Sequence, residues 1–177
     1  MRVVAGELRG RRLLAPRGWR VRPTSDRVRE AVFSALGDVA GAKVLDLYCG
    51  TGALAIEALS RGAAQATLVD RDTRPALGNV ESLGLRDRVE LVRADVPNWL
   101  AAEGGNARCD LVFIDAPYRL ADRVGREIDS QLPRVLAAGG RVIVESAARS
   151  PLRVTSLSRL RERRYGRTHV AFYGEGS

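Results

Sequence analysis

The sequence predicts an α/β protein built on a doubly wound, mostly parallel sheet. Short apolar runs alternate along the chain with segments in which apolar residues recur at helical spacing. A glycine-rich loop follows the first long apolar run, and an aspartate stands at or just after the end of four successive runs. Open α/β sheets bind ligands at the carboxyl ends of their strands, so these aspartates mark the expected site.

The first part of the chain is expected to be a basic extension at 1–37, ahead of a main domain at 38–177. Residues 1–22 resemble a β-hairpin, with short apolar segments separated by glycine and proline. Thr24-Ser25-Asp26 is typical of a helix N-cap, and Gly37 is expected to end the helix that follows.

From residue 43 onward, strands and helices are expected to alternate. The expected strands cover 43–47, 66–70, 89–93, 109–115 and 141–145. The expected helices cover 53–61, 72–83, 96–103 and 120–137, and most of them end at a glycine. Segments 159–165 and 168–173 meet at Gly166 and predict a C-terminal antiparallel hairpin, which brings the sheet to seven strands.

Positive charge is concentrated in two parts of the chain. The formal net charge is +8, yet residues 1–30 contain nine arginines against three acids, and residues 149–167 contain seven against one. A polyanion such as nucleic acid is the partner that this distribution favours. The alternative is a solvated, arginine-rich surface with no partner.

Several classes of protein are disfavoured by what the sequence lacks. It contains no apolar run long enough to span a membrane, and its start has no signal-peptide core. Two cysteines and one histidine give neither a disulfide framework nor a metal-ligand spacing. We expect a cytoplasmic monomer without a metal and without membrane association.

The glycine loop lies at the first strand-to-helix turn, where Gly50 and Gly52 permit close approach of a ligand. It also matches the loose dinucleotide pattern, which is a weak signal because such loops are common. Asp46 precedes the loop and disfavours an anionic phosphate at this position. A ligand with a positive or amino group fits better, and S-adenosylmethionine (SAM) carries a sulfonium and an amino-acid head.

The next two strand ends also carry acids. Asp70 could accept hydrogen bonds from both ribose hydroxyls of an adenosyl group. Asp95 could accept a hydrogen bond from the adenine amino group while Val96 packs on the ring. Asp72 and Asp95 could instead be ordinary helix N-caps.

The fourth strand ends in Asp115-Ala116-Pro117-Tyr118. The Asp115 carboxylate and the Ala116 carbonyl can accept hydrogen bonds from one NH2 group, and Tyr118 can stack on a ring. Pro117 restricts the backbone before it, which limits the direction of the Ala116 carbonyl. The alternative is a strand that ends in a common proline turn with a surface tyrosine.

Taken together, these motifs resemble the RsmD family of bacterial 16S ribosomal RNA guanine-N2 methyltransferases. The resemblance rests on residues 1–6, 9–13, 22–33, 44–54 and 57–63, and on the similarity of 115–118 to the (Asp/Asn)-Pro-Pro-(Tyr/Phe) signature. It implies a Rossmann-like class I methyltransferase fold and SAM as cofactor. The implied substrate is a guanine, conventionally numbered 966, in 16S ribosomal RNA within the 30S subunit or its assembly intermediate.

The resemblance also implies residue roles. The cofactor would be bound by Asp46, Tyr48, Gly50, Thr51, Gly52, Asp70, Arg71, Asp95 and Val96. The catalytic residues around the guanine would be Asp115, Ala116, Pro117 and Tyr118. The RNA would be contacted by Arg9, Arg11, Arg12, Arg22, Thr24, Arg27 and Arg29. Ala116 replaces the usual first proline of the signature, and Cys49 replaces a small residue.

Other functions stay open at this point. A nicotinamide-dependent oxidoreductase is disfavoured by Asp46 and by the Asp115–Tyr118 motif. A non-catalytic RNA-binding assembly factor is disfavoured by the intact row of acids. Among amine methyltransferases, the adenine N6 of DNA or a protein glutamine are alternative targets, because they share the same signature.

Overall fold

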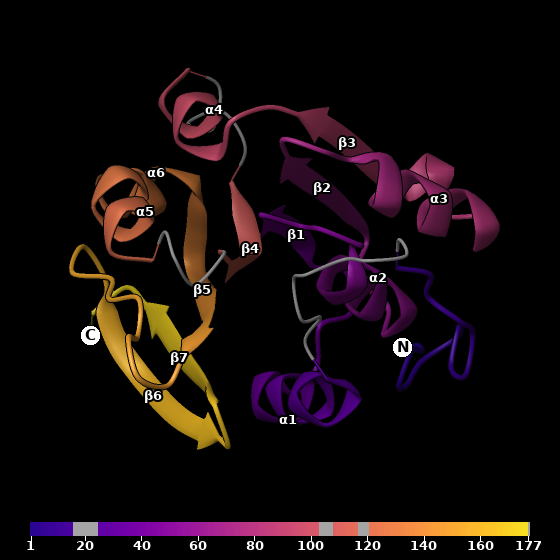
Figure 1. The fold of residues 1–177 in the computed structure, drawn as a ribbon, viewed down its shortest axis with the longest axis horizontal. Helices are drawn as coiled ribbons and strands as arrows, with labels where there is room; N and C mark the ends of the chain where they lie inside the picture. The colour runs from indigo at the N-terminus through magenta and orange to yellow at the C-terminus, as the bar shows by residue number, and fades with distance from the viewer. Residues whose placement is uncertain (16–24, 103–107, 117–120, 177) are drawn as a thin grey trace.

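The computed structural model describes residues 1–15, 25–102, 108–116 and 121–176. Its centre is a seven-stranded sheet in the order β3-β2-β1-β4-β5-β7-β6 (Figure 1). The strands are β1 (Lys43–Leu47), β2 (Gln65–Asp70), β3 (Val89–Arg93), β4 (Cys109–Asp115), β5 (Leu136–Ala147), β6 (Ser158–Tyr165) and β7 (Thr168–Gly174). Neighbours among β1 to β5 pair in parallel, whereas β7 pairs antiparallel with both β5 and β6. This topology confirms the predicted doubly wound sheet and its C-terminal hairpin.

Helices cover both faces of the sheet (Figure 1). On one face lie α1 (Asp26–Leu36), α2 (Ala53–Ser60) and α3 (Arg74–Ser82), and on the other lie α4 (Val96–Ala102), α5 (Ala121–Ile128) and α6 (Leu132–Val135). Successive strand residues point to opposite faces, so Phe113 packs with the first group and Val112 with the second. We call the face covered by α1, α2 and α3 the α1 face, and the face covered by α4, α5 and α6 the α5 face. A 3-10 turn, η1 (Arg86–Arg88), precedes β3.

The helix expected at 120–137 is divided in the structure, so that prediction is wrong in its extent. After α5, a 3-10 turn, η4 (Asp129–Gln131), leads to the short α6, and β5 already begins at Leu136. Pro133 explains the break because proline fits only in the first turn of a helix, which is its place in α6. Gly140 then lies inside β5, where an added Cβ would come within 2.8 Å of the Ala137 carbonyl oxygen.

The N-terminal segment packs against the main domain instead of standing apart from it. The described parts of its two arms meet at a β-bridge between Arg2 and Arg12, and the Val3 amide donates to the Arg11 carbonyl at 2.9 Å. Val3 and Leu13 are buried in the same apolar cluster as α1 and α2. The helix cap is as expected, since Ser25 Oγ accepts from the Val28 amide at 3.3 Å. The described part of the extension therefore shares the core of the sheet.

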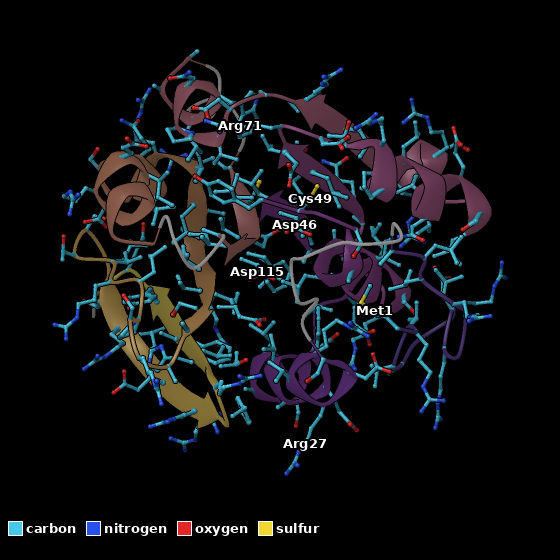
Figure 2. The ribbon with its side chains drawn as sticks, viewed as in Figure 1. Met1, Arg27, Asp46, Cys49, Arg71 and Asp115 are labelled. Carbon is cyan, nitrogen blue, oxygen red and sulfur yellow. The ribbon has the colours of Figure 1, made fainter. Side chains whose placement is uncertain are left out.

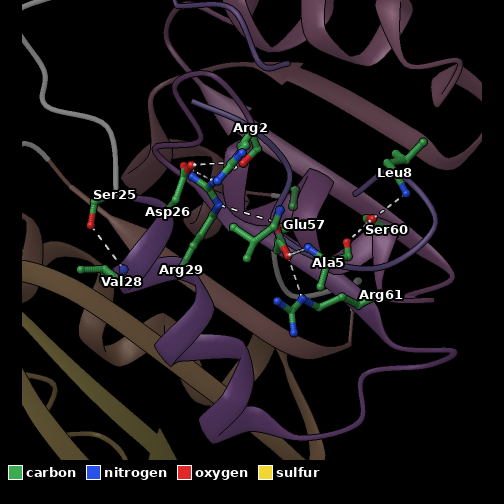
Figure 3. Close-up of polar contacts among 12 residues, drawn as sticks. Arg2, Ala5, Leu8, Ser25, Asp26, Val28, Arg29, Glu57, Ser60 and Arg61 are labelled. Carbon is green, nitrogen blue, oxygen red and sulfur yellow. Dashed lines mark hydrogen bonds and ion pairs between the residues drawn. The ribbon is translucent and has the colours of Figure 1, made fainter. Parts of the chain in front are cut away.

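A buried carboxylate, Glu57 of α2, fixes this segment (Figure 3). It accepts hydrogen bonds from the amides of Val4 at 2.8 Å and Ala5 at 3.0 Å, and from Arg61 Nε at 2.8 Å. The Nε of Arg29 lies 3.7 Å from the same carboxylate. One side chain therefore joins the N-terminal segment, α1 and α2.

The buried position of Arg29 corrects its predicted role. Its side chain has no exposed surface, and its Nη2 donates to Asp26 Oδ1 at 2.8 Å and also to the carbonyl of Arg2. A guanidinium enclosed in this way cannot contact a phosphate without unfolding the junction. The prediction that Arg29 binds RNA is therefore wrong, because the charge serves a buried ion pair.

Within the described ranges, no helix combines the length and the apolar character needed to cross a membrane.

We expect Glu57→Ala to lower the free energy of unfolding by about 3–5 kcal/mol, because it removes the buried acceptor of the Val4 and Ala5 amides and the carboxylate beside Arg61 and Arg29. Urea unfolding at pH 7 measures the change. Glu81→Ala on α3 is the control, since Glu81 is exposed and its loss should change stability by less than about 0.5 kcal/mol. Equal losses in the two variants would contradict the anchoring role of Glu57.

Candidate functional site

The carboxyl ends of the parallel strands bring the predicted acids to one edge of the sheet. Asp46 of β1 is in register with Leu68 of β2 and with Phe113 of β4, so Asp70 and Asp115 extend just beyond it on the neighbouring strands. Figure 2 shows Asp46, Cys49 and Asp115 close together in the centre of the molecule, with Arg71 further along the same edge. Asp46, Asp70 and Asp115 therefore lie at the carboxyl edge of the sheet, and their role as site residues stays a prediction.

The glycine loop has the tight backbone that its sequence predicted. Gly50 and Gly52 have φ values of 53° and 75°, in the left-handed region that favours glycine. An added Cβ at Gly52 would lie 2.9 Å from the Leu68 side chain and 3.4 Å from Ala76 Cβ. Gly52 therefore allows the loop to pack directly against β2 and α3, which fixes its height above the sheet.

Asp46 lies beneath this loop and is almost completely buried. Its Oδ2 accepts a hydrogen bond from the Ala55 amide at 3.2 Å, so it holds the first turn of α2. Burial raises the pKa of the Asp46 carboxyl from 3.8 to about 7, the Ala55 hydrogen bond lowers it, and the nearby charge of Asp70 raises it further. A cation placed beside Asp46 would favour the ionised form.

Asp70 connects the glycine loop to the next strand end. Its Oδ2 accepts from the Gly50 amide at 3.0 Å, and its Oδ1 accepts from the Asp72 amide at 3.0 Å. Each carboxylate oxygen can accept a further hydrogen bond. The same side chain can therefore hold the loop and still receive ligand hydroxyls.

Arg71 and Asp95 were predicted separately, and the structure pairs them. Arg71 Nε donates to Asp95 Oδ2 at 2.8 Å, across the ends of β2 and β3. Asp95 directly precedes α4, but its side chain contacts Arg71. Val96 begins α4 and is buried beside this pair. The ion pair gives Asp95 a defined position at the edge of the site.

The end of β4 carries Asp115, half-buried, and Ala116, which is buried. The remaining two residues of the motif, Pro117 and Tyr118, lie outside the described residues. Asp115 is in register with Glu145 of β5, a buried carboxylate that the sequence reasoning did not include in the site. The sequence contained a signal for Glu145, because this residue stands at the end of an apolar run, as Asp46 and Asp70 do.

Asn79 is a second residue that the sequence reasoning missed. Its side chain is fully buried in α3, and its Nδ2 donates to the Thr51 carbonyl at 3.0 Å and to the Leu14 carbonyl at 2.9 Å. Its Oδ1 accepts from the Leu14 amide at 2.8 Å. Asn79 thus joins the glycine loop to the N-terminal segment. An amide at a core-facing helical position, between Ala76 and Val80, was the available signal.

Two side chains of the loop are held in their neutral forms. Burial raises the pKa of the Cys49 thiol, and the charges of Asp46 and Asp70 add to the effect. This disfavours a thiolate nucleophile. Burial likewise raises the pKa of Tyr48, whose hydroxyl has no hydrogen-bond partner in the described part of the chain. Tyr48 also has a left-handed φ of 61°, unusual for a residue with a side chain.

Four of the arginines predicted to contact RNA are on the surface. Arg9, Arg11, Arg12 and Arg27 are all exposed, and among their side-chain contacts with described residues is a hydrogen bond from Arg11 to the Ser82 carbonyl at 3.1 Å. Figure 2 shows Arg27 pointing away from the body of the protein. Arg22 and Thr24 lie outside the described residues.

The arrangement suits the binding of a polar, partly cationic ligand above the loop and of an amine at the end of β4. Acceptor oxygens predominate along this edge, and Arg71 is paired with one of them. Among the described residues, no group of His, Cys, Asp and Glu side chains is placed to hold a metal ion.

Comparison with known proteins supports this description. Residues 1–174 match the family Cons_hypoth95, described as conserved hypothetical protein 95. The chain is 33% identical to YlbH of Bacillus subtilis, whose name describes it as an rRNA methyltransferase, over 98% of each chain. It is 38% identical to ribosomal RNA small subunit methyltransferase D of Escherichia coli K12, over 67% of this chain and 61% of that protein.

The fold also matches that of solved structures. The structure of yhhF from Escherichia coli, described as a methyltransferase, aligns with a TM-score of 0.84 at 33% identity. That alignment covers 98% of this chain and 96% of yhhF. The seven-stranded sheet and its C-terminal hairpin are therefore those of the class I methyltransferase fold.

The raised pKa of Asp46 predicts a pH dependence of stability. The unfolded carboxyl ionises near 3.8 and the folded one near 7, so the folded state retains a proton between these values. The proton retained on Asp46 contributes fully to the free energy of unfolding below pH 3.8. As the pH rises through 7 this contribution is lost, and the free energy of unfolding falls by up to about 4 kcal/mol.

Asp46→Asn should therefore remove this part of the pH dependence, while the wild type loses stability relative to it between pH 4 and 7. Urea unfolding across that range measures both proteins. Parallel stability curves for the wild type and Asp46→Asn would contradict the assigned protonation.

Proposed function

We propose that this chain, which belongs to the Cons_hypoth95 family, transfers a methyl group from SAM to the exocyclic N2 of a guanine in 16S ribosomal RNA. Its similarity to ribosomal RNA small subunit methyltransferase D also confirms the resemblance to the RsmD family.

One observation carries the proposal: a line of acceptor groups joins the glycine loop to the end of β4. Asp70 and Asp46 lie at the loop, and Asp115 lies on the adjacent strand at the same edge. In the proposed complex, Asp70 receives the ribose hydroxyls of SAM, Asp95 receives the adenine amino group, and Asp46 faces the amino-acid head. The methyl group then lies between the loop and Asp115.

The guanine amine is the group that Asp115 is suited to accept. A carboxylate and the Ala116 carbonyl can receive both hydrogens of one NH2 group. In the proposed complex, Tyr118 stacks on a base turned out of its RNA context, a contact worth about 1–3 kcal/mol. Pro117 restricts the backbone that carries the Ala116 carbonyl.

The chemical step is mainly one of positioning. The N2 lone pair of guanine is delocalised into the ring, so it attacks poorly. Hydrogen bonds to Asp115 and to the Ala116 carbonyl favour a more pyramidal nitrogen directed at the methyl carbon. The N–C bond forms as the C–S bond breaks, S-adenosylhomocysteine leaves, and the proton released from N2 passes to Asp115 or to water.

The proposed setting is the cytoplasm, with a monomer acting on the 30S subunit or its assembly intermediate. The exposed arginines of the N-terminal segment contact phosphates there, and guanine 966 is the position that the RsmD resemblance suggests. A transfer assay with labelled SAM tests the proposal by offering 30S subunits, protein-free 16S RNA and DNA that lack the modification, followed by mapping of the modified nucleotide. Label in DNA adenine alone would refute it.

We expect Asp115→Ala to lower the rate of methyl transfer by at least about 100-fold, because the amine loses its charged acceptor. SAM affinity, measured by calorimetry, should change by less than about threefold, since the adenosyl contacts remain. Asp87→Ala, an exposed acid in η1, is the control. Near-normal turnover in Asp115→Ala would remove Asp115 from the mechanism.

Replacing both Arg12 and Arg27 with glutamine should weaken RNA binding and lower the slope of log K against log salt by about 1.5 for two lost phosphate contacts. Filter binding at several salt concentrations measures the slope. The control is Arg126→Gln with Arg134→Gln, exposed positions on α5 and α6. If the two double variants show the same slope, the N-terminal arginines do not contact RNA.

A further inference from the structure

The edge strand β6 carries a second basic surface that the proposed function leaves without a role. Residues 158–164 are all exposed, and four of the eight residues of the strand are arginines. We propose that one face of this strand, through Arg161 and Arg163, binds the phosphates of the same RNA whose base enters the site. This inference rests on the proposed function and adds a second contact surface to it.

Strand register separates the arginines of β6 into two sets. Arg161 is opposite Phe172 and Arg163 is opposite Val170, and both partners pack on the α1 face. Arg159 is opposite Tyr173, which packs on the α5 face. Paired residues of neighbouring strands share a face, so Arg161 and Arg163 lie on the α1 face.

Arg164 belongs to the second set, with Arg159. It is opposite His169, which directly precedes Val170 in β7. Because successive residues of a strand alternate between faces, His169 and Arg164 lie on the α5 face. Glu162 lies on that face too, because its carboxylate contacts His169 Nε2 at 3.2 Å. We call Arg161 and Arg163 the inner pair, and Arg159 and Arg164 the outer pair.

The inner pair is aligned with the catalytic edge. Asp115 of β4 is in register with Glu145 of β5. Glu145 is opposite Val170 of β7, and Val170 is in turn opposite Arg163 of β6. These four residues form one row across the sheet and share its α1 face. Adjacent strands are separated by about 4.8 Å, so the backbones of Asp115 and Arg163 are about 14 Å apart along the row.

The turn of the hairpin lies at the same end of the sheet. Ala147, at the carboxyl end of β5, pairs with Thr168, and the Ala148 amide donates to the Arg167 carbonyl at 2.9 Å. Figure 1 shows this turn beside α1, the helix that carries exposed Arg27. Tyr165, next to the turn, packs into the α1-face cluster. The inner pair thus lies close to the hairpin turn, at the end of the sheet that carries the site.

The charges of the inner pair are available to a ligand. In the described part of the chain, the Arg161 side chain makes no hydrogen bond or ion pair, and the Arg163 side chain contacts only the neighbouring Glu162 carbonyl, at 3.1 Å. The outer pair differs, because Arg159 Nη1 forms an ion pair with Glu162 at 3.0 Å. Glu162, the single acid of the strand, therefore neutralises charge on the α5 face only.

Phosphate groups are the ligand that this chemistry fits. Guanidinium groups bind phosphate oxygens through two parallel hydrogen bonds, and their charge is weakly hydrated. Among the exposed residues of β6, Leu160 is apolar and the others are Ser158, Glu162 and the four arginines, so a phosphate backbone fits this strand better than an apolar protein surface. The other explanation is that arginines simply protect an edge strand from pairing with other sheets. If the arginines only protect the edge, those on the α1 face and those on the α5 face of β6 should be equally important.

The test compares two double variants with equal loss of charge on the same strand. One replaces the inner pair (Arg161→Gln with Arg163→Gln), and the other replaces the outer pair (Arg159→Gln with Arg164→Gln). Binding to protein-free 16S RNA and to 30S subunits is measured over a range of salt, together with KM and kcat for methyl transfer. Melting temperature and light scattering report on folding and association.

We expect the inner-pair variant to bind RNA at least tenfold more weakly and to lose about 1.5 from its salt slope. Its KM for RNA should rise while kcat at saturation and SAM affinity stay unchanged. The outer-pair variant should remain within about twofold of the wild type.

Equal effects of the two double variants, or aggregation as the sole change, would overturn the proposal in favour of edge protection. Weaker binding to 30S subunits alone, with an unchanged salt slope, would overturn it in favour of a ribosomal protein contact. Failure of the proposed function is distinguishable, because wild-type protein would then bind RNA without transferring a methyl group to it.

Discussion

The interaction on which the rest of the structure depends is the buried carboxylate of Glu57. It is enclosed in the core, where a charge is tolerated only if its hydrogen bonds are satisfied. The amides of Val4 and Ala5 and the guanidinium of Arg61 meet that requirement, and Arg29 lies close by. The N-terminal segment and α1 are therefore held in place by the electrostatic needs of one side chain of α2.

The same helix begins at the candidate site. Asp46 holds the Ala55 amide in the first turn of α2, and Glu57 lies two residues further along the same helix. Asn79 makes a parallel connection, with hydrogen bonds to Thr51 in the glycine loop and to Leu14 in the N-terminal segment. The loop proposed to bind SAM and the segment proposed to bind RNA thus share two rigid polar junctions.

Strong local patterns explain what the sequence predicted well. β1, β3 and β4 have the predicted bounds. For β1 and β4 the reason is that buried parallel strands show as largely continuous apolar segments. The expected helix at 120–137 had the right apolar content but contained Pro133, which divides it. The Asp115 and glycine-loop motifs are local as well, and their roles as site residues remain predictions.

The fold class, the glycine loop and the family resemblance could be predicted from the sequence, because each depends on spacing between residues near one another in the chain. Only the tertiary structure decided that Arg29 is buried beside Glu57, that Asn79 joins the loop to Leu14, and that Arg161 and Arg163 share a face with Asp115. The physical reason is that burial and strand register depend on contacts between distant segments. Exposed and buried arginines look alike until the chain has folded.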